Sequence, residues 1–452
     1  MRHGPVLQIE LEKRLKMLGR RNLMKTIFRA LTLAILMTVF TAAAVTSSFA
    51  QDAQAEKTAL YQKYIENYDK SVDKKKIAIE AAKQYVEKYG ANPEDKEQVD
   101  YFKANIPVLE EAVRKAGEAA AFDALVKRFD ASVPAKNFDD TYASGKELLA
   151  KNPDLLDVVI VLGSIGYDES LKTPANTKYN ADTISYAKMA IQRIESGKTS
   201  KNYGAFQQYT YCGIKEFPDC KANALGWLNY NIGYLMYFNQ NQKKEAIPYF
   251  YKATQYNSAT KTFPVIYQVI GAAYFDEAKR LSQESEEKAK AAGNVDTDES
   301  KAAYAMAKGY ADRAIDAYAR AYKIAGANAG TKPEYKAGLY KVLQDLFKFR
   351  FDNKIDGLDS YVASVMNKPF VDPSVAVTPV VEATPATSTS SLSSTSNTTV
   401  AATPEASKGT AVKAGTTVAA TKPAAPAAAV KTTVTKSKTP AKKPVTKKKG
   451  TR

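Results

Sequence analysis

Apolar side chains recur at spacings of three and four through residues 55–370, without the long alternating stretches that indicate half-buried strands. The first such positions are Leu60, Tyr64, Tyr68, Ile77, Ala81, Ala82 and Tyr85. Gly and Pro fall between these series, where they are expected to end helices. Residues 158–162 alone form a strand-like aliphatic run, but their neighbours have helical spacing, so we expect helix there too. The pattern predicts an all-α body.

One pattern of residues occurs three times between residues 229 and 369. Each copy has a helix signature, then a turn, then a second helix with the spacing Ala-x3-aromatic-x2-small. The first copy consists of Ile232, Gly233, Ala246, Phe250 and Ala253. The second consists of Tyr267, Ile270, Gly271, Tyr274, Ala314, Tyr318 and Ala321, and the third, degenerate copy ends in Gly357, Tyr361, Ser364 and Pro369. The first copy has one extra residue in its turn. The second has about thirty extra residues, which we interpret as extended helices broken at Gly293 and Asn294.

This spacing resembles the tetratricopeptide repeat (TPR), whose pattern is aromatic-x2-Leu-Gly-x2-Tyr, then Ala-x3-Phe-x2-Ala and a terminal Pro. The resemblance implies an all-α, TPR-like α-solenoid of antiparallel helix pairs. It is clear over residues 225–370 and weaker over 51–224, where we expect a helical domain with degenerate repeats. Small residues at each crossing would let paired helices approach closely, and large residues would fill the space between pairs.

In tetratricopeptide proteins the first helix of each pair lines a groove that holds peptides or partner helices. Counted from Gly233, the resemblance places an aromatic row in that groove, made of Trp227, Tyr230, Tyr234, Tyr237 and Phe238. Aromatic side chains commonly anchor interfaces because they offer large contact area at low entropic cost. The alternative is that these rings form core between neighbouring helices, as aromatic stripes at helical spacing usually do.

Charge is concentrated at the two ends of the chain, although the formal net charge is +17. Residues 401–452 carry twelve Lys or Arg against Glu405 alone, and residues 1–30 carry eight against Glu10 and Glu12. The remainder is close to neutral, so net charge gives no support for a nucleic-acid surface on the body.

Residues 24–50 have the design of a secretory signal peptide, with a basic start at Lys25 and Arg29, an apolar stretch, and a small-x-small site ending at Ala50. We therefore expect export to the periplasm or cell envelope, with residues 1–23 as a mis-assigned extension upstream of Met24. An uncleaved membrane anchor is the alternative reading. Cys212 and Cys220 are the only cysteines, and an oxidising compartment would let them pair in a structural disulfide, the alternative being a redox or metal pair.

The sequence contains none of the catalytic motifs considered below. The only histidine, His3, precedes the signal, so the mature chain has none for a Ser-His or Cys-His relay. The segment Gly197-Lys198-Thr199 resembles the end of a phosphate loop, but Gln192 occupies the place of a required Gly. We expect no enzyme, no cofactor and no metal, although unseen convergence of carboxylates remains the third alternative.

Residues 371–452 contain no aromatic side chain and consist mainly of Ala, Thr, Pro, Ser, Val and Lys. This composition predicts a disordered tail, because it buries too little apolar surface to offset chain entropy. Its basic end would contact an anionic envelope polymer, the alternative being a solubilising spacer. The lysines expected to make this contact are Lys442, Lys443, Lys447, Lys448 and Lys449.

The functional hypothesis is a non-enzymatic, exported scaffold that binds a protein or peptide partner in its helical groove and reaches the envelope through its tail. The alternative is a structural envelope or spacer protein without a specific groove ligand. Exposure of Trp227 and Tyr234 in one groove would favour the scaffold, and burial of both would favour the spacer.

Overall fold

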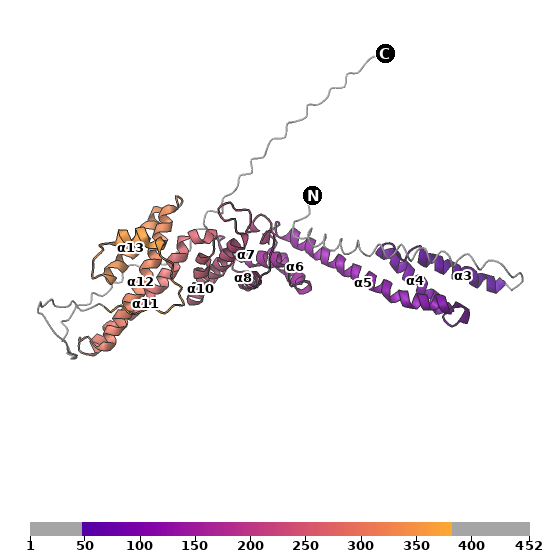
Figure 1. Cartoon of the computed structure of the whole chain (residues 1–452), viewed down its shortest axis with the longest axis horizontal. Coiled ribbons are helices and arrows are strands. Elements are labelled where there is room, and N and C mark those ends of the chain that lie inside the picture. The colour runs from indigo at the N-terminus through magenta and orange to yellow at the C-terminus, as the bar shows by residue number, and fades with distance from the viewer. Residues whose placement is uncertain (1–47, 382–452) are drawn as a thin grey trace, which may run out of the picture. The chain divides into compact units, whose positions relative to one another are not determined.

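The computed structural model describes residues 48–381, which fold almost entirely into helices (Figure 1). The helices of the first half are α3 (Ser48–Ile65), α4 (Val72–Tyr89), η2 (Pro93–Asp95), α5 (Lys96–Ser132), α6 (Phe138–Lys151), α7 (Leu156–Ser170) and α8 (Asn180–Glu195). Those of the second half are α9 (Cys220–Tyr234), η3 (Leu235–Asn239), α10 (Lys243–Gln255), η4 (Ala259–Thr262), α11 (Pro264–Ala291), α12 (Asp298–Ala327), α13 (Pro333–Arg350), α14 (Leu358–Ser364) and η5 (Val365–Asn367). The all-α prediction is confirmed, and residues 158–162 lie inside α7.

The described residues divide into two compact units. Unit 1 comprises residues 48–166 and 178–228, and unit 2 comprises residues 167–177 and 229–381. Each unit is described by itself below.

Helices α3, α4 and the first half of α5 share a core in unit 1. The ring of Tyr64 lies at its centre, 4.9 Å from the ring of Phe102 and stacked 5.4 Å from that of Tyr68. Asp95, just before α5, connects the three helices. Its carboxylate accepts hydrogen bonds from the Tyr85 hydroxyl of α4 at 3.0 Å and from Lys57 Nζ of α3 at 2.5 Å. This network ties the start of α5 to both α3 and α4.

The second half of α5 packs on α6, and α7 packs on α8. A Cβ atom built on Gly163 of α7 would lie 2.8 Å from the backbone nitrogen of Ala187 in α8. One helical turn further along α7, the amide of Gly166 donates to the hydroxyl of Thr183 at 2.9 Å, and Thr183 lies one turn before Ala187 in α8. Positions thus increase along α7 as they decrease along α8, so the pair is antiparallel.

Residues 196–219 join α8 to α9 through an irregular segment with two short antiparallel strands, β1 (Gly204–Ala205) and β2 (Tyr209–Thr210). The sequence did not predict these strands. Asp157 of α7 fixes the segment, because its carboxylate accepts hydrogen bonds from the Ser200 hydroxyl and from the Gly204 amide. The turn needs left-handed backbone at Tyr203, Gly204 and Phe206, a conformation that such anchoring can hold.

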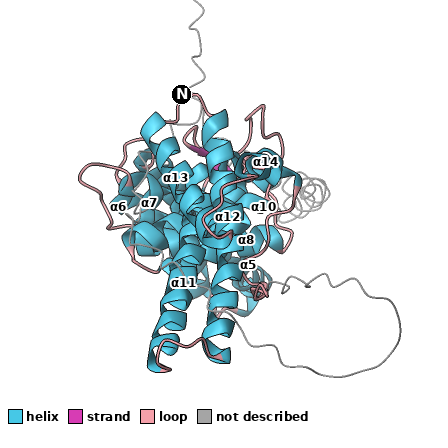
Figure 2. Ribbon diagram, turned by 90° about the vertical axis from the view of Figure 1, so that its left-hand side faces the viewer, coloured by secondary structure: helices cyan, strands magenta, loops and turns pink. Residues whose placement is uncertain are grey.

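Unit 2 is built around the long helix pair α11 and α12. Gly271 of α11 faces Tyr318 of α12, and Ser285 near the end of α11 donates to the carbonyl of Ser300 at 2.7 Å, so these two helices are antiparallel. Figures 1 and 2 show the loop end of the α11–α12 pair extending beyond the other helices of this unit. The predicted break lies between α11 and α12, where Gly293 and Asn294 both have positive φ. Helix α13 then packs on α12, as does α14.

A π-helical turn, η3, ends the first helix of the first repeat. The amide of Gln240 donates to the carbonyl of Leu235, five residues earlier, at 3.0 Å. A π turn holds one residue more than an α-helical turn does. It accounts for the extra residue that the sequence shows in this copy of the repeat.

Candidate functional site: binding surfaces

The predicted aromatic row does not form one exposed groove. Tyr230 and Tyr234 are both 0% exposed, and Tyr230 packs its ring 5.1 Å from that of Phe263 and 6.0 Å from that of Phe250. Tyr167 lies 5.1 Å from Tyr234, edge to face. Burial raises the pKa of both Tyr230 and Tyr234. These contacts contradict the expectation that the two tyrosines bind a partner, because their faces are covered by the chain's own rings.

The physical reason lies in the crossing at Gly233. Phe250 of α10 approaches that glycine so closely that a Cβ atom there would be 3.1 Å from the ring, which brings Tyr230 into the space between the helices. The sequence correctly predicted a close helix crossing at Gly233, but it did not predict that Tyr230 and Tyr234 would be buried there.

Three members of the row keep partial exposure. Tyr237 and Phe238, on η3, lie with their ring centroids 4.8 Å apart, and Lys243 Nζ lies 5.7 Å from the centroid of Tyr237. Trp227 is also partly exposed, but it belongs to unit 1, where it stacks on Tyr211 with a centroid separation of 6.4 Å. The row is therefore divided between the two units at residues 228 and 229.

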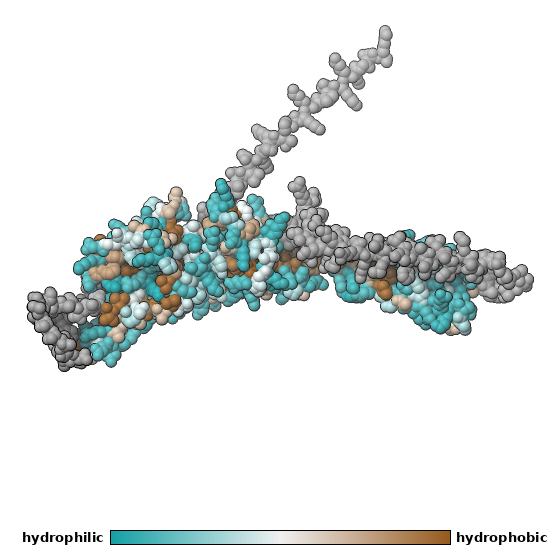
Figure 3. Space-filling view, viewed as in Figure 1, coloured by the Kyte–Doolittle hydropathy of each residue, from teal (hydrophilic) through white to brown (hydrophobic). Residues whose placement is uncertain are grey.

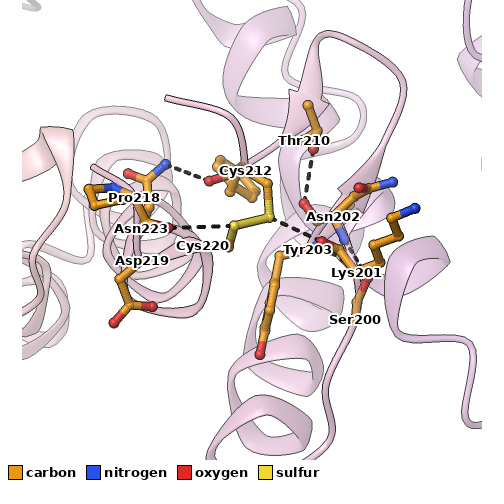
Figure 4. Close-up of a disulfide and its surroundings, with 12 residues drawn as sticks. Ser200, Lys201, Asn202, Tyr203, Thr210, Cys212, Pro218, Asp219, Cys220 and Asn223 are labelled. Atoms are coloured by element: carbon orange, nitrogen blue, oxygen red, sulfur yellow. Dashed lines mark hydrogen bonds between the residues drawn. A yellow bond between two sulfur atoms is a disulfide. The ribbon is translucent and has the colours of Figure 1, made fainter. Parts of the chain in front are cut away.

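Cys212 and Cys220 are joined in a disulfide, with their Cα atoms 4.6 Å apart (Figure 4). The loop that they close is tied to its surroundings on both sides. The Asn223 side chain donates to the carbonyl of Tyr211 at 3.0 Å, and the Thr210 hydroxyl donates to the carbonyl of Asn202 at 2.9 Å. The arrangement is that of a structural bond which fixes the start of α9.

Asp157, which holds residues 200–204 to α7, is a partly buried carboxylate. Burial raises its pKa, and the hydrogen bonds from Ser200 and Gly204 oppose that shift. Its contacts are those of a group that holds residues 200–204 to α7.

Residues 368–381 form a strap that the sequence did not anticipate. They follow η5 without regular structure and lie along α10, α11 and α12 of unit 2. The carbonyl of Lys368 accepts from Arg320 Nη2 at 2.8 Å, and the amide of Val380 donates to the carbonyl of Ala305 at 2.9 Å. The disordered tail predicted from residue 371 onward is therefore wrong for residues 371–381. The rest of the predicted tail lies outside the described residues.

Phe370 is the strap's anchor. Its ring lies 5.3 Å from the ring of Tyr267 in α11 and 5.9 Å from that of Tyr251 in α10. The guanidinium carbon of Arg320 lies 5.1 Å from the Phe370 centroid, within cation–π range. Burial raises the pKa of Tyr267 to about 12, as expected for a phenol enclosed by rings and aliphatic side chains. The sequence offered a signal for this anchor, because Phe370 is the last aromatic residue of the chain.

A cleft of about 830 Å3 opens beside Phe370. Its walls include the last turns of α10 and α12 together with Tyr267, Met366 and Pro369. Arg320 and Lys261 are the charged residues of this lining, and both are cationic. Arg320 is only 4% exposed and is held by Asp316, whose carboxylate oxygen lies 2.9 Å from its Nε. We call the site that receives the Phe370 ring its seat, which is formed by Tyr251, Tyr267 and Arg320. The seat contains the Arg320 cation, which Asp316 of the same helix holds in place.

Other chemistry is not indicated in the described part of the chain. Within residues 48–381, no three His, Cys, Asp or Glu side chains cluster closely enough to hold a metal ion. The same residues include no helix with the combined length and apolarity needed to cross a bilayer. Figure 3 shows a mostly hydrophilic face on which hydrophobic side chains form separate patches.

Several sequence predictions concern segments that the structure does not describe. These are the extension 1–23, nearly all of the signal 24–50, and the basic residues Lys442, Lys443, Lys447, Lys448 and Lys449.

Comparisons with protein-family models, with curated proteins and with solved structures found no match to this chain.

Proposed function

We propose that this protein is a non-enzymatic, exported scaffold of TPR-like helix pairs that binds a protein or peptide partner. The pairing supports this proposal. Gly233 lies against Phe250 and Gly271 against Tyr318, which are the small and large positions that the repeat pattern brings together. Stacked pairs of this kind offer extended surfaces suited to binding chains.

The observation that carries the proposal is the strap. Unit 2 holds residues 368–381 on its helices, as two irregular stretches joined by a turn in which the Val375 amide donates to the Asp372 carbonyl. The half-buried ring of Phe370 anchors this strap, and hydrogen bonds with the helices hold its backbone at Lys368, Phe370 and Val380. A surface that binds an extended segment of its own chain has the geometry and hydrogen-bonding groups to bind one from another protein.

Export and envelope contact complete the proposal. The apolar segment before Ala50 supports export, and the disulfide between Cys212 and Cys220 is compatible with an oxidising compartment. The lysine-rich end of the chain would contact an anionic envelope polymer through its charge.

A spacer function is the second candidate, and the burial of Tyr230 and Tyr234 favours it. With these rings in the core, the predicted groove loses its central contacts. In that case the helices would only separate the basic tail from another surface.

Site-specific photocrosslinking separates the two candidates. A photoreactive phenylalanine would be placed in the full chain at Phe238, at Trp227 or at Lys442, and each protein incubated with envelope extract. A scaffold gives one discrete adduct from Phe238 or Trp227 that is absent from a control at Val108, which is 64% exposed on α5. Adducts from Lys442 alone would overturn the scaffold proposal and favour the spacer.

A further inference from the structure

The strap is held mainly through its backbone. The hydroxyl of Tyr251 donates to the carbonyl of Phe370 at 3.4 Å, Arg320 donates to the carbonyl of Lys368, and Ala305 accepts from the amide of Val380. The strap's aliphatic side chains contribute less, since Val371 is 39% exposed and Val375 is 51% exposed. Contacts of this kind recognise an extended chain with little regard to its sequence.

Phe370 is the strap's one aromatic side chain and it fills a formed seat, while the half-buried Val377 packs beside Gly309. Phe370 lies between Tyr251 and Tyr267 under Arg320, and Pro369 before it favours extended backbone at the preceding residue. The seat does not depend on the strap for its shape, because Asp316 positions Arg320 from within α12. A Pro-aromatic pair in an extended chain is therefore what this site selects.

The far end of the strap passes over small residues of α12. A Cβ atom on Gly309 would lie 2.2 Å from the carbonyl oxygen of Thr378, so only glycine at that position lets the backbone approach. Beside Phe370 the cleft of about 830 Å3 leaves space that the strap does not fill. The site is thus larger than its present occupant.

We propose that the seat formed by Tyr251, Tyr267 and Arg320 binds an extended segment of a partner protein that carries a Pro-aromatic pair, and that the strap is its internal competitor. This inference rests on the proposed binding function and names the ligand class and its regulation. A partner segment gains access by displacing Phe370. Because few side chains hold the strap, the exchange needs no rearrangement of the helices.

Fluorescence anisotropy with a labelled peptide tests the proposal. The peptide copies residues 367–381 (Asn-Lys-Pro-Phe-Val-Asp-Pro-Ser-Val-Ala-Val-Thr-Pro-Val-Val), and the proteins are the full chain, Phe370→Ala and Val375→Ala. We expect Phe370→Ala to bind the peptide about tenfold more tightly than the full chain does, because the competitor has lost its anchor. Val375→Ala should bind like the full chain, and a peptide with Ala in place of its Phe should bind none of them. Equal affinity of Phe370→Ala and the full chain would overturn the proposal.

Hydrogen exchange on the unmodified chain provides a readout that does not depend on the folding of a variant. Excess peptide should speed exchange of the Val380 amide, which loses its bond to Ala305, while amides within α12 stay protected. Unchanged exchange at Val380 would contradict displacement. A stable dimer of the full chain in light scattering would instead identify the occupant as a second copy's strap and overturn the partner assignment. Failure of these tests together with a discrete Trp227 adduct would reject this seat while leaving the scaffold function standing.

Discussion

The ring of Tyr318 in α12 lies over Gly271 in α11, so that a Cβ atom at position 271 would be 2.7 Å from ring atom Cδ2. The two residues come from the two halves of one predicted repeat and meet across forty-six intervening positions. Their contact sets how closely α11 and α12 approach.

Glycine-to-alanine substitutions should therefore differ according to what faces each glycine. At Gly163 the obstacle is the backbone of Ala187, which cannot move alone, so we expect Gly163→Ala to cost ~1–3 kcal/mol of unfolding free energy. At Gly271 the obstacle is a ring that can shift, so Gly271→Ala should cost less. Gly117→Ala is the control, because nothing lies within 4 Å of its Cβ position and the helix should gain ~0.5–1 kcal/mol. Urea unfolding measures all three, and equal effects would contradict the packing account.

Asp157→Asn tests the partly buried carboxylate that holds Ser200 and Gly204. Because its native pKa is raised, the native state holds this proton more tightly than the unfolded chain does. The contribution of Asp157 to stability therefore falls as pH rises through the interval between the ordinary Asp pKa and the raised one. Asn still accepts from Ser200 and Gly204 but does not ionise, so the variant should gain stability relative to the parent across that interval. Urea midpoints at several pH values measure this, and a pH-independent difference would contradict it.

Asp95 should show the opposite pH dependence. Burial alone would raise the pKa of Asp95, but hydrogen bonds from Lys57, Asn92 and Tyr85 outweigh burial and lower it. Its stabilising contribution is thus present above the ordinary Asp pKa and is lost as pH falls through the lowered value.

Asp95→Ala would leave three donors, on Lys57, Asn92 and the buried Tyr85, without their acceptor, and we expect a loss of ~2–4 kcal/mol at neutral pH. The matched control is Asp73→Ala, which removes the exposed 3.2 Å ion pair with Lys76 and should change stability by less than ~0.5 kcal/mol. Thermal unfolding of both variants measures the difference, and similar midpoints would contradict a structural role for the Asp95 network.

Replacing Cys212 and Cys220 together by Ser tests the loop. The two residues are eight positions apart, and closing so short a loop in the unfolded chain stabilises the native state by ~2–3 kcal/mol. The parent protein treated with a reductant should unfold at the same lower temperature as the double variant. A double variant that melts with the oxidised parent would show that the bond adds nothing.

Two sets of substitutions test the basic tail, one that removes its charge and one that keeps it. Changing Lys442, Lys443, Lys447, Lys448 and Lys449 to Gln should reduce sedimentation with anionic-lipid vesicles, by ~1 kcal/mol of binding for each charge near the surface. Changing the same five residues to Arg should leave binding intact at low salt. Loss of binding in the Arg variant would mean that charge alone does not explain the contact.

The sequence predicted the helices well because their apolar period is local information. It placed α11, α12 and the break at Gly293 and Asn294 correctly. Ion pairs along one helix are local in the same way, because they join residues three or four positions apart. The structure shows Glu284 paired with Lys288 at 2.8 Å and with Arg280 at 2.9 Å. Spacings of three and four are sufficient for such inferences.

The binding surfaces were harder to predict because they depend on contacts between distant residues. Tyr230 has the spacing of a groove residue, but whether it is exposed depends on Phe250 and Phe263 further along the chain. Strands β1 and β2 depend on Asp157, forty-seven positions before Gly204. The strap has no periodicity, and its order comes from Arg320 and Tyr251 rather than from its own composition.

The strap also decides where a mechanical load would enter the protein. Tension applied through residues beyond 381 meets the Val380 bond to Ala305 first and the Phe370 seat only afterwards. Such a force breaks the strap's contacts one after another, starting from the end nearest residue 381, rather than all at once. The force would reach helices α13 and α14 only after the hydrogen bond between Lys368 and Arg320 had broken. Tension on the tail would therefore remove Phe370 from its seat before it unfolded these helices.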